Sequence, residues 1–530
     1  MASLQHLHQE LFQREWNEAL SERQNYSNEI ERYEKRFLCE LSQDASVTSL
    51  EALHASILRS HILLYGDFHT SRASVDGCRN ILRDLYKNRS LVLCVEIFRA
   101  EDQPYIDAYL LGNMTEFDFL EAIQYESDWG FPWKHYQELL TTARDFKIPV
   151  YGIDTNRKGL DQLQKRDKFM SQRLYAIQKN NKNSLLICVV GENHLAQSHL
   201  PDHLTKLGVS QDYIVRIVNN IDQYFFKCLE QKSSFPIYLS VAERYFCIMN
   251  STPWSKWKSF NMWSDLKASL IEASDHKTYD YNEIRIDLDY HFYEICRDLS
   301  DFLGLSIAQE NLQKFCIDES SFQWLSGFQK NSTSLQKDYG LYDLDRYTVC
   351  FNEHWQDAFP YLAGQFLYHM LHPHFNFSGD ACMVFYKYVL WNAIGTMCAK
   401  IFDPHFSVMN FYHHKEYLLF YESKNCSQQY FISKEVISVF ETIKRKDGLT
   451  VQIIKDSFEK CSRGISLEVA YLLGQMIGSE CLSRYPFQSN EIDVMRIFFC
   501  KDLHNIEDVL LILSKMMPHL DPFEEHQNAA

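Results

Sequence analysis

The sequence contains 530 residues, of which 46% are hydrophobic and 23% are charged, a composition typical of folded globular proteins. A chain of this length forms about two to four domains. The formal net charge is −17, with 53 basic and 70 acidic residues, and this excess of acid argues against a dedicated nucleic-acid binder. The 15 cysteines form no C-x-x-C pair, which favours reduced thiols in a cytosolic protein over disulfides or a zinc ribbon.

Targeting signals are not evident in the sequence. The first residues, MASLQHLHQELFQREWNEAL, contain no apolar stretch or cleavage signature of a secretory signal. The most apolar segment, residues 381–402, is interrupted by Lys387, Asn392 and Lys400, so we interpret it as a buried core helix. We therefore expect a cytoplasmic protein without a transmembrane segment.

The periodicity of apolar residues changes near residue 61. Residues 3–60 have the spacing of helices, and short apolar runs separated by longer amphipathic stretches follow them. These runs are HILLY (61–65), SLVLCVEIF (90–98), IPVYGID (148–154), SLLICVV (184–190) and DYIVRIV (212–218). Strands that are apolar on both faces and alternate with helices indicate a mainly parallel sheet covered by helices. The pattern predicts one α/β domain over residues 1–225, with a helical extension at its N-terminus.

The second half of the chain has a different pattern. Strand-like runs become rare after about residue 230, so we predict a mainly helical region over residues 226–530, which could divide into two subdomains. Two segments begin with Tyr-Leu-x-Gly-Gln, at residues 361–371 and 471–482. Because glycine in an apolar helix permits close helix–helix contact, the repeat indicates two packed helices, and a duplicated helical unit is the alternative.

Two predicted strands end in a glycine that is followed three residues later by a histidine. Gly66 precedes His69, and Gly191 precedes His194. A third strand carries Glu96 near its carboxyl end. Ligands of parallel α/β sheets bind outside the carboxyl ends of the strands, and glycine lets the chain turn sharply or approach a ligand. We therefore expect these side chains to lie together at one edge of the sheet.

Three of these side chains could carry chemistry. Two imidazoles and a carboxylate, here His69, His194 and Glu96, can bind a divalent metal ion and leave a position for water or substrate. The same side chains can act as general acid and base without a metal ion. Asp67 and Glu192, which follow the motif glycines, add carboxylates nearby. The alternative is that each histidine only caps a loop.

Three further residues are candidates for the same site. Trp133 and Tyr136 have a helical spacing that indicates packing against the sheet, and lining the ligand pocket is the alternative. A tyrosine can also ligate haem iron. Arg166 could hold a carboxylate or phosphate in the pocket, or lie on a solvated helix face.

Two clusters outside these motifs are also candidates. Tryptophans alternate with lysines in TPWSKWKSFNMW (252–263), which we interpret as aromatic packing between domains, with a membrane-surface or nucleic-acid face as the alternative. A second group contains five residues that could bind metal, namely Glu353, His354, His369, His372 and His374. This group has no H-E-x-x-H pattern, so surface and capping histidines are favoured over a second metal site.

Six motifs follow one another in the first half of the chain. They are Gly66-x-x-His69, Val-Glu-Ile-Phe (95–98), Trp133-x-x-Tyr136, Pro-Val-Tyr-Gly-Ile-Asp (149–154), Arg166-Asp167-x-x-Met170 and Gly191-Glu-Asn-His194. In this order they resemble the ChaN-like domain, which belongs to the superfamily that contains Tiki, TraB and the erythromycin esterases. The resemblance covers roughly residues 60–215, and Asp67 departs from it because relatives usually have glutamate there.

The resemblance implies an α/β fold with a site at the strand ends. ChaN proteins are described as haem-binding and linked to iron uptake, and Tiki proteins are metal-dependent proteases that use both Gly-x-x-His motifs and the glutamate. These roles fall on His69, Glu96 and His194 here, as metal ligands or catalytic residues. By the same resemblance the cofactor is haem or a divalent transition metal. Trp133, Tyr136 and Arg166 are our candidates for further cofactor-binding residues.

The leading hypothesis is a ChaN-like domain that binds haem or a metal ion, with metal-assisted hydrolysis as a companion activity. One alternative is a metal-dependent hydrolase that acts on an ester or a peptide. Another is a catalytically silent α/β scaffold whose helical half binds a partner protein. If Glu96 is a metal ligand or a general base, we expect Glu96→Gln to weaken metal binding or turnover while the fold survives.

Overall fold

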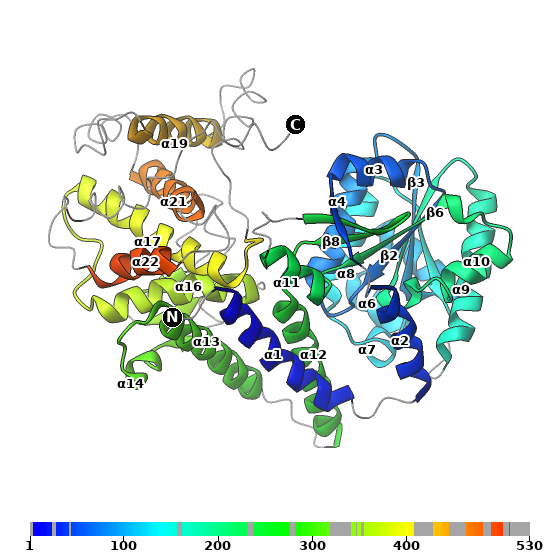
Figure 1. Ribbon diagram of the computed structural model, residues 1–530, viewed down its shortest axis with the longest axis horizontal. Helices are drawn as coiled ribbons and strands as arrows, with labels where there is room; N and C mark the ends of the chain where they lie inside the picture. The colour runs from blue at the N-terminus through cyan, green and yellow to red at the C-terminus, as the bar shows by residue number, and fades with distance from the viewer. Residues whose placement is uncertain are drawn as a thin grey trace. The chain divides into compact units, whose positions relative to one another are not determined.

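The computed structural model divides the chain into two compact units, His8–Thr278 and Met1–Leu7 with Tyr279–Ala530 (Figure 1). The described residues are 4–23, 28–41, 44–155, 162–230, 237–275, 281–317, 341–345, 347–350, 355–406, 428–444, 463–480, 489–501 and 508. The first unit is an α/β unit, and the second is mainly helical. This confirms the fold class that the sequence predicts.

The α/β unit is built on an eight-stranded sheet, counted over the described residues, with the order β1-β7-β8-β6-β2-β5-β3-β4. Its strands are β1 (Ser46–Thr48), β2 (Ile62–Asp67), β3 (Leu91–Arg99), β4 (Val150–Asp154), β5 (Leu185–Gly191), β6 (Ile214–Asn219), β7 (Ile237–Ala242) and β8 (Tyr245–Met249). The pairs from β8 through β6, β2, β5 and β3 to β4 are all parallel. Only β7 pairs antiparallel with its neighbours, β1 and β8, among the strands described.

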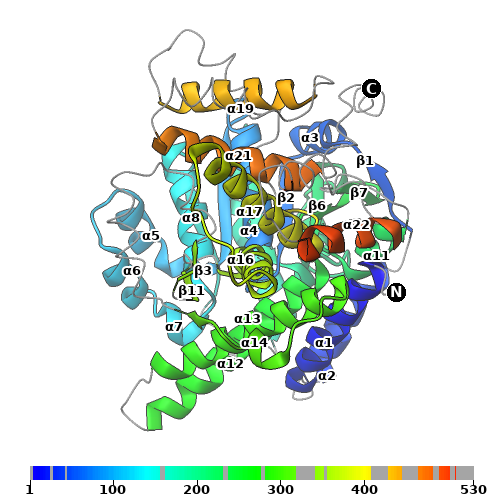
Figure 2. The same cartoon turned by 90° about the vertical axis from the view of Figure 1, so that its left-hand side faces the viewer.

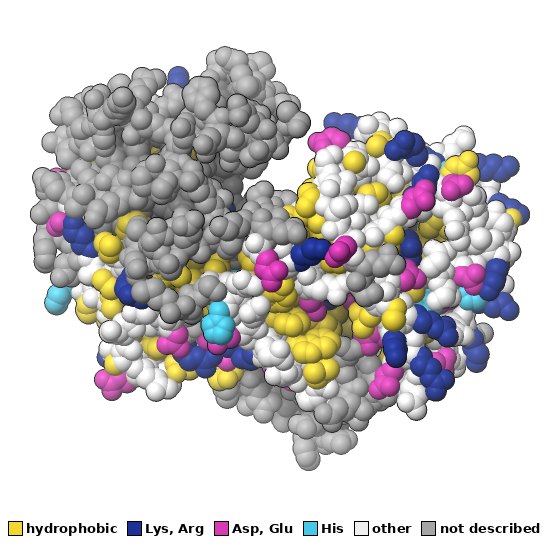
Figure 3. Space-filling view, viewed as in Figure 1, with side chains coloured by type: hydrophobic (Ala, Val, Ile, Leu, Met, Phe, Trp, Pro, Cys, Tyr) yellow, Lys and Arg dark blue, Asp and Glu magenta, His cyan; other side chains and the backbone are white. Residues whose placement is uncertain are grey.

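Helices flank this sheet (Figure 1). The helices of this unit are α1 (Leu4–Arg23, from His8 onward), α2 (Asn28–Leu41), α3 (Leu50–Leu58), α4 (Arg72–Leu85), η1 (Ala100–Asp102), α5 (Gln103–Leu110), α6 (Glu116–Ala122), α7 (Tyr125–Asp128), α8 (Trp133–Asp145), α9 (Leu163–Asn180), η3 (Glu192–Leu195), α10 (Leu200–Lys206), η4 (Gln211–Tyr213), α11 (Asp222–Glu230) and α12 (Pro253–Asp275). The space-filling view shows basic and acidic side chains interspersed on the visible face of this unit (Figure 3).

The central strands are apolar on both faces because helices bury both. Every residue of β2 and β3 is buried, and Leu63, Val95 and Ile187 belong to one hydrophobic core. Burying such a side chain contributes roughly 1.5–3 kcal/mol, so this core supplies much of the driving force for folding. The apolar runs of the sequence therefore identify these strands correctly.

The α/β unit ends at Thr278, beyond the boundary that the sequence analysis places at residue 225. Strands β7 and β8 pair in the sheet, and α12 follows them within the same unit. The pattern of β7 alternates between buried and more exposed residues, unlike the continuous burial of the central strands. A search for strands that are apolar on both faces therefore misses this edge of the sheet.

The second unit is mainly helical, with a small sheet in the order β10-β11-β9. Its described elements are α13 (Tyr281–Leu303), α14 (Gln309–Leu312), β9 (Cys316–Ile317), β10 (Leu341–Asp343), β11 (Thr348–Cys350), α16 (Trp355–Leu371), α17 (Ala381–Phe402), α19 (Gln428–Lys444), α21 (Arg463–Glu480) and α22 (Ser489–Cys500). Helices α16 and α21, which carry the two Tyr-Leu-x-Gly-Gln segments, both pack on α17 (Figure 2).

The glycines of these two segments explain the close packing. A Cβ at Gly364 would lie 2.6 Å from Cys398 Sγ, and a Cβ at Gly474 would overlap the Val389 carbonyl oxygen of α17. The sequence interpretation of two packed helices is therefore confirmed, with α17 as their shared partner.

Helix α17 is the apolar segment at residues 381–402. Most of its side chains are buried in the unit, and Lys387 near its start donates to the carbonyl oxygens of Asn376 and Ser378, at 2.7 and 3.1 Å. Within the described part of the chain, no helix combines the length and the apolar character that crossing a membrane requires.

Candidate functional site

Four parallel strands end at one edge of the α/β sheet. Asp67 at the end of β2 pairs in register with Gly191 at the end of β5, and Asp154 ends β4. The register between β3 and β4 shifts between Val95 and Arg99, the stretch that contains Glu96. The sequence prediction that these strand ends meet at a common edge is therefore confirmed.

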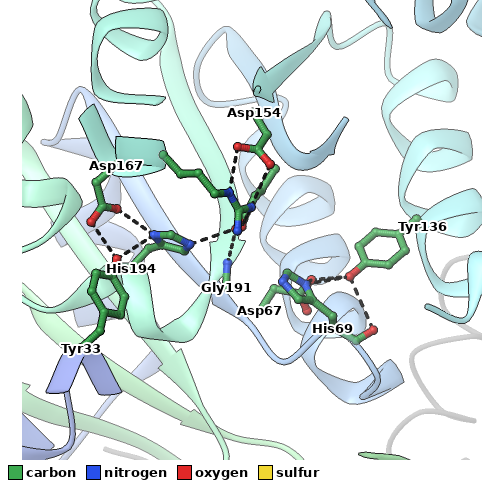
Figure 4. A network of polar contacts seen from close by, with 10 residues as sticks. Tyr33, Asp67, His69, Tyr136, Asp154, Asp167, Gly191 and His194 are labelled. Atoms are coloured by element: carbon green, nitrogen blue, oxygen red, sulfur yellow. Dashed lines mark hydrogen bonds and ion pairs between the residues drawn. The ribbon is translucent and has the colours of Figure 1, made fainter. Parts of the chain in front are cut away.

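Gly191 lies at the centre of the predicted site (Figure 4). A Cβ added to this glycine would lie 3.2 Å from His69 Nε2 and 3.6 Å from Glu96 Oε2. It would also lie 3.5 Å from His194 Cδ2. The two histidines and the glutamate thus surround one glycine, and a side chain at this position would contact all three.

His69 forms the first half of the site. Its Nδ1 lies 2.9 Å from Asp67 Oδ2, and the Tyr136 hydroxyl donates to the same carboxylate oxygen at 2.5 Å. Burial lowers the pKa of His69, but the Asp67 carboxylate outweighs this and raises it above its usual value. In the neutral imidazole the carboxylate holds the proton on Nδ1, so the lone pair is on Nε2, the atom nearest Gly191. The side chain is 18% exposed.

His194 forms the second half, and both of its ring nitrogens have partners. Nδ1 lies 2.7 Å from Asp167 Oδ1 and 2.8 Å from the Tyr33 hydroxyl, and Nε2 lies 3.3 Å from Glu96 Oε1. Burial lowers the pKa of His194, but the carboxylates of Glu96 and Asp167 outweigh it and raise the pKa to about 10. This side chain, which is 4% exposed, is therefore an imidazolium near neutral pH.

Arg166 links the strand ends by a buried ion-pair network. Its Nη2 lies 2.5 Å from Glu96 Oε1 and 2.8 Å from Asp154 Oδ2, and its Nε donates to Asp154 Oδ1 at 3.1 Å. The Gly191 amide donates to Glu96 Oε2 at 2.5 Å. Burial raises the pKa of Glu96, but His194 and Arg166 outweigh it and hold this pKa well below its usual value. The buried carboxylate stays ionised because cations and an N–H group surround it.

These charges bear on the predicted metal site. In the described ranges, no group of three or more His, Cys, Asp or Glu side chains is arranged to hold a metal ion. Glu96 is paired with Arg166, and the imidazolium form of His194 has no lone pair for a metal. The trio comes together as predicted, but within an ion-pair network, and its binding of a metal ion stays a prediction.

The three predicted cofactor-binding residues take different positions. Arg166 lies in the site, through its pairs with Glu96 and Asp154. Tyr136 is fully buried and reaches the site through its bond to Asp67, so its hydroxyl is occupied. Trp133 packs against the hydrophobic core, with its ring centroid 5.2 Å from that of Tyr125. For Trp133 the structure agrees with core packing, the first interpretation from its spacing.

The sequence analysis missed three side chains that pair with site residues. Tyr33 of α2 donates to Asp167 Oδ2 at 2.7 Å, and Lys256 of α12 donates to both oxygens of Glu192 at 3.1 Å. Asp167 follows Arg166 in the fifth motif, so its position gave a signal for its role at the site. Tyr33 lies in a helix without a motif, and Lys256 lies in the segment 252–263, where the alternation of tryptophans and lysines does not indicate its partner Glu192.

The tryptophans of segment 252–263 pack on aromatic rings of the same unit. Trp257 and Trp263 pack on Phe68 and Phe131 at centroid distances of 5.4 and 4.8 Å, within the α/β unit, which corrects the interpretation of packing between domains.

The histidines of the second group have separate partners. In the helical unit, His369 Nδ1 lies 3.0 Å from the Tyr342 hydroxyl, and His372 Nε2 lies 2.7 Å from the Phe499 carbonyl oxygen. His374 is exposed, and Glu353 and His354 lie outside the described residues. His374 is thus a surface histidine, as interpreted from the sequence, whereas His369 is buried within the helical unit.

A family model agrees with the motifs. Residues 53–166 match the sequence model of the family described as "Haem-binding uptake, Tiki superfamily, ChaN". A solved structure described as "Cofacial heme binding to ChaN of Campylobacter jejuni" is 14% identical, with a TM-score of 0.25, and the match covers 33% of this chain and 87% of that chain. None of the curated proteins matches the sequence.

The matched segment contains His69, Glu96 and Arg166 and ends before His194. It also lies inside the α/β unit of the structure. The chain therefore contains a ChaN-like domain, which covers part of its length.

Proposed function

We propose that the α/β unit binds haem, with His69 Nε2 as the protein ligand to the iron. The observation that carries this proposal is the contrast in available donor atoms around Gly191. Among the predicted trio, Glu96 pairs with Arg166 and both ring nitrogens of His194 have carboxylate partners, whereas the carboxylate partner of His69 is at Nδ1 and its Nε2 faces Gly191. A free metal ion needs three or four protein donors, whereas haem iron receives four from the porphyrin and needs only one or two more.

The surroundings of His69 fit this role. A histidine that binds a metal usually donates its other ring N–H to a carboxylate, and Asp67 accepts that bond here. The rings of Trp129 and Phe131 lie 5.6 and 4.8 Å from the imidazole, as centroid distances. Bound haem would supply an iron centre, and these residues would orient its ligand and surround it with apolar surface. The family description of residues 53–166 as haem-binding supports the same proposal.

Glu96 and Arg166 have a positioning role in this proposal. Glu96 accepts the Gly191 amide and so fixes the strand end that faces His69. Arg166 ties this carboxylate to Asp154 on β4, which keeps two strand ends together. Neither side chain has to touch the iron.

A hemin titration of the full chain tests the proposal. Wild-type protein is expected to give a Soret band typical of histidine-ligated haem, and His69→Ala should lose that band or weaken binding by at least about tenfold. His61→Ala is the matched control, because His61 lies beside the opposite end of β2 and stacks on Tyr213 at 4.3 Å. An unchanged spectrum and affinity in His69→Ala would refute ligation by this histidine.

A second function, hydrolysis of an ester or peptide, is favoured by a specific observation. His69 and His194 face the same glycine with different partners. Burial lowers the pKa of His194, but Glu96 and Asp167 outweigh it and raise this pKa to about 10, whereas Asp67, the carboxylate partner of His69, lies at Nδ1 and leaves Nε2 facing Gly191. Two histidines in such different surroundings can serve as a general base and an electrostatic or acidic partner.

Turnover of model esters and peptides in the presence of a chelator tests this second function. Activity that survives chelation and is lost in His69→Ala would support metal-independent hydrolysis. Activity that the chelator abolishes would support the metal-dependent hydrolase instead. No turnover together with no haem binding would favour the silent scaffold.

A further inference from the structure

We infer that α12 completes the ligand site and selects a planar conjugated macrocycle, through an aromatic wall formed by Trp129, Phe131 and Trp263. Helix α12 lies outside residues 53–166, so Trp263 is an addition of this chain to the matched ChaN-like segment, which contains Trp129 and Phe131. The inference rests on the proposed function for the position of the ligand beside His69. What the inference adds is a role for Trp263 in determining which ligands the site binds.

The aromatic wall is continuous with His69. Phe131 is the central ring, with its centroid 4.8 Å from both the His69 and the Trp263 rings and 5.9 Å from Trp129. All three rings of the wall are only partly buried, as is His69. The histidine with the open lone pair therefore lies at one end of a partly exposed aromatic surface.

Hydrogen bonds fix the wall in place. The Trp263 indole N–H donates to the Gly130 carbonyl oxygen at 2.7 Å, between the two other residues of the wall. Gly130 has a φ of +62°, a conformation that favours glycine and turns the chain between Trp129 and Phe131. Because the residue that turns the loop also accepts the bond from α12, the helix and the loop hold one another.

Two further contacts join α12 to the loops that follow β2 and β5. Ser259 Oγ lies 2.9 Å from Thr70 Oγ1, next to His69 in sequence, and Lys256 is paired with Glu192. These contacts tie one helix to both Gly-x-x-His loops. A wall that is held in this way binds a ligand with little loss of conformational entropy.

The chemistry of the wall indicates the ligand class. Aromatic rings attract the faces and edges of other conjugated rings. The polar groups of α12 closest to the site, on Lys256, Ser259 and Trp263, are each bonded inside the unit. They are therefore engaged, and recognition of a sugar or a free phosphate would need other groups. A flat, largely apolar macrocycle fits this surface better.

Binding of iron-free protoporphyrin IX to the full chain isolates the wall from iron ligation. Titration followed by porphyrin fluorescence is expected to show about tenfold weaker binding for Trp263→Leu and for Phe131→Leu. Trp263→Phe keeps a ring and should retain more affinity than Trp263→Leu. Phe146→Leu is the matched control, because Phe146 is also partly buried but stacks on Tyr86 at 4.0 Å, in another part of the core.

The outcomes separate the wall from the iron ligand. Wild-type affinity in both Trp263→Leu and Phe131→Leu, with folding verified by circular dichroism, would overturn the inference. Porphyrin binding that depends on the wall, together with hemin binding that does not depend on His69, would support the inference and reject the proposed ligand. Absence of binding of either porphyrin by the wild-type chain would overturn both.

Discussion

The two Gly-x-x-His motifs are equivalent in sequence and different in electrostatics. His69 has one carboxylate neighbour, Asp67, on Nδ1, and its Nε2 faces Gly191. His194 lies between Asp167 and Glu96, and both of its nitrogens are engaged. A histidine at the same place after a parallel strand is thus a ligand candidate in one case and a buried cation in the other.

The difference comes from what packs against each loop. Helices α2 and α9 bring Tyr33, Asp167 and Arg166 to the His194 side. On the other side, His69 contacts Tyr136 of α8 and the ring of Phe131, which precedes α8. Phe131 in turn packs on Trp263 of α12. A motif therefore predicts where a side chain lies. The neighbouring helices determine its charge and whether it can bind a ligand.

The largest expected effect tests whether the His194 side is an ion-paired network. Arg166→Met leaves Glu96 and Asp154 buried without their cation, which should lower the free energy of unfolding of the α/β unit by about 3–5 kcal/mol at pH 7.5. Arg79→Met is the control, because Arg79 forms its pairs with Asp76 and Glu138 near the surface and should cost about 1 kcal/mol or less. Hydrogen exchange of the β5 amides measures the free energy of unfolding of both variants. Equal losses of stability in Arg166→Met and Arg79→Met would contradict the buried ion-pair network.

The charge of Glu96 can be removed with little change of shape. Glu96→Gln should lower the free energy of unfolding by about 1–3 kcal/mol, because the amide still accepts the bond from Gly191. Hemin binding should stay within a few-fold of wild type. A loss of bound metal or of turnover by about 10²–10⁴ in a folded Glu96→Gln protein would instead favour a ligand or general base at this position, as the sequence analysis expected.

A methyl group at Gly191 tests the open side of His69. The Cβ of Gly191→Ala would lie 3.2 Å from His69 Nε2, where an iron ligand must approach. Overpacking of this kind costs about 1–3 kcal/mol, so hemin affinity should fall roughly tenfold or more. Circular dichroism and hemin titration measure fold and binding together. Wild-type hemin affinity in the folded variant would place the ligand elsewhere.

The pH dependence of stability tests the cationic state of His194. Its pKa is raised from the ordinary value near 6.5 to about 10 in the folded protein, so its contribution is complete below pH 6.5 and is lost as the pH rises through about 10. The stability difference between wild type and His194→Gln should therefore shrink between pH 6.5 and 10. Burial raises the pKa of thiols such as Cys78 and Cys247 in the folded protein, and the cysteines of the unfolded chain are common to both proteins. A constant difference would show that the imidazole is neutral.

The smallest expected effect concerns Tyr33. Tyr33→Phe removes one hydroxyl from the bonds around Asp167 and His194, which remain bonded to each other at 2.7 Å. The expected loss is about 1 kcal/mol, with hemin binding unchanged. Urea unfolding and hemin titration of this variant measure both effects. A large loss of hemin affinity would mean that the His194 side contributes directly to the ligand site.

The sequence predicts the centre of the fold well, because the strands β2, β3 and β5 are buried on both faces and must be apolar throughout. It predicts β7 poorly, because that strand is only half-buried. The sequence also predicts that His69, Glu96 and His194 lie close together, because their strands are parallel neighbours in the sheet. Their charges do not follow from it, because the deciding partners come from helices whose packing is a tertiary property.

The most direct test of the contrast is a histidine NMR titration of uniformly labelled protein from pH 6 to 10, with His69→Ala and His194→Gln used to assign the two rings. We expect His194 to stay protonated on both nitrogens up to a pKa of about 10. His69 should lose its Nε2 proton at a lower pH and keep the proton on Nδ1, beside Asp67. Loss of the His194 proton first, or a His69 proton that remains on Nε2, would contradict the assignment of the available ligand to His69.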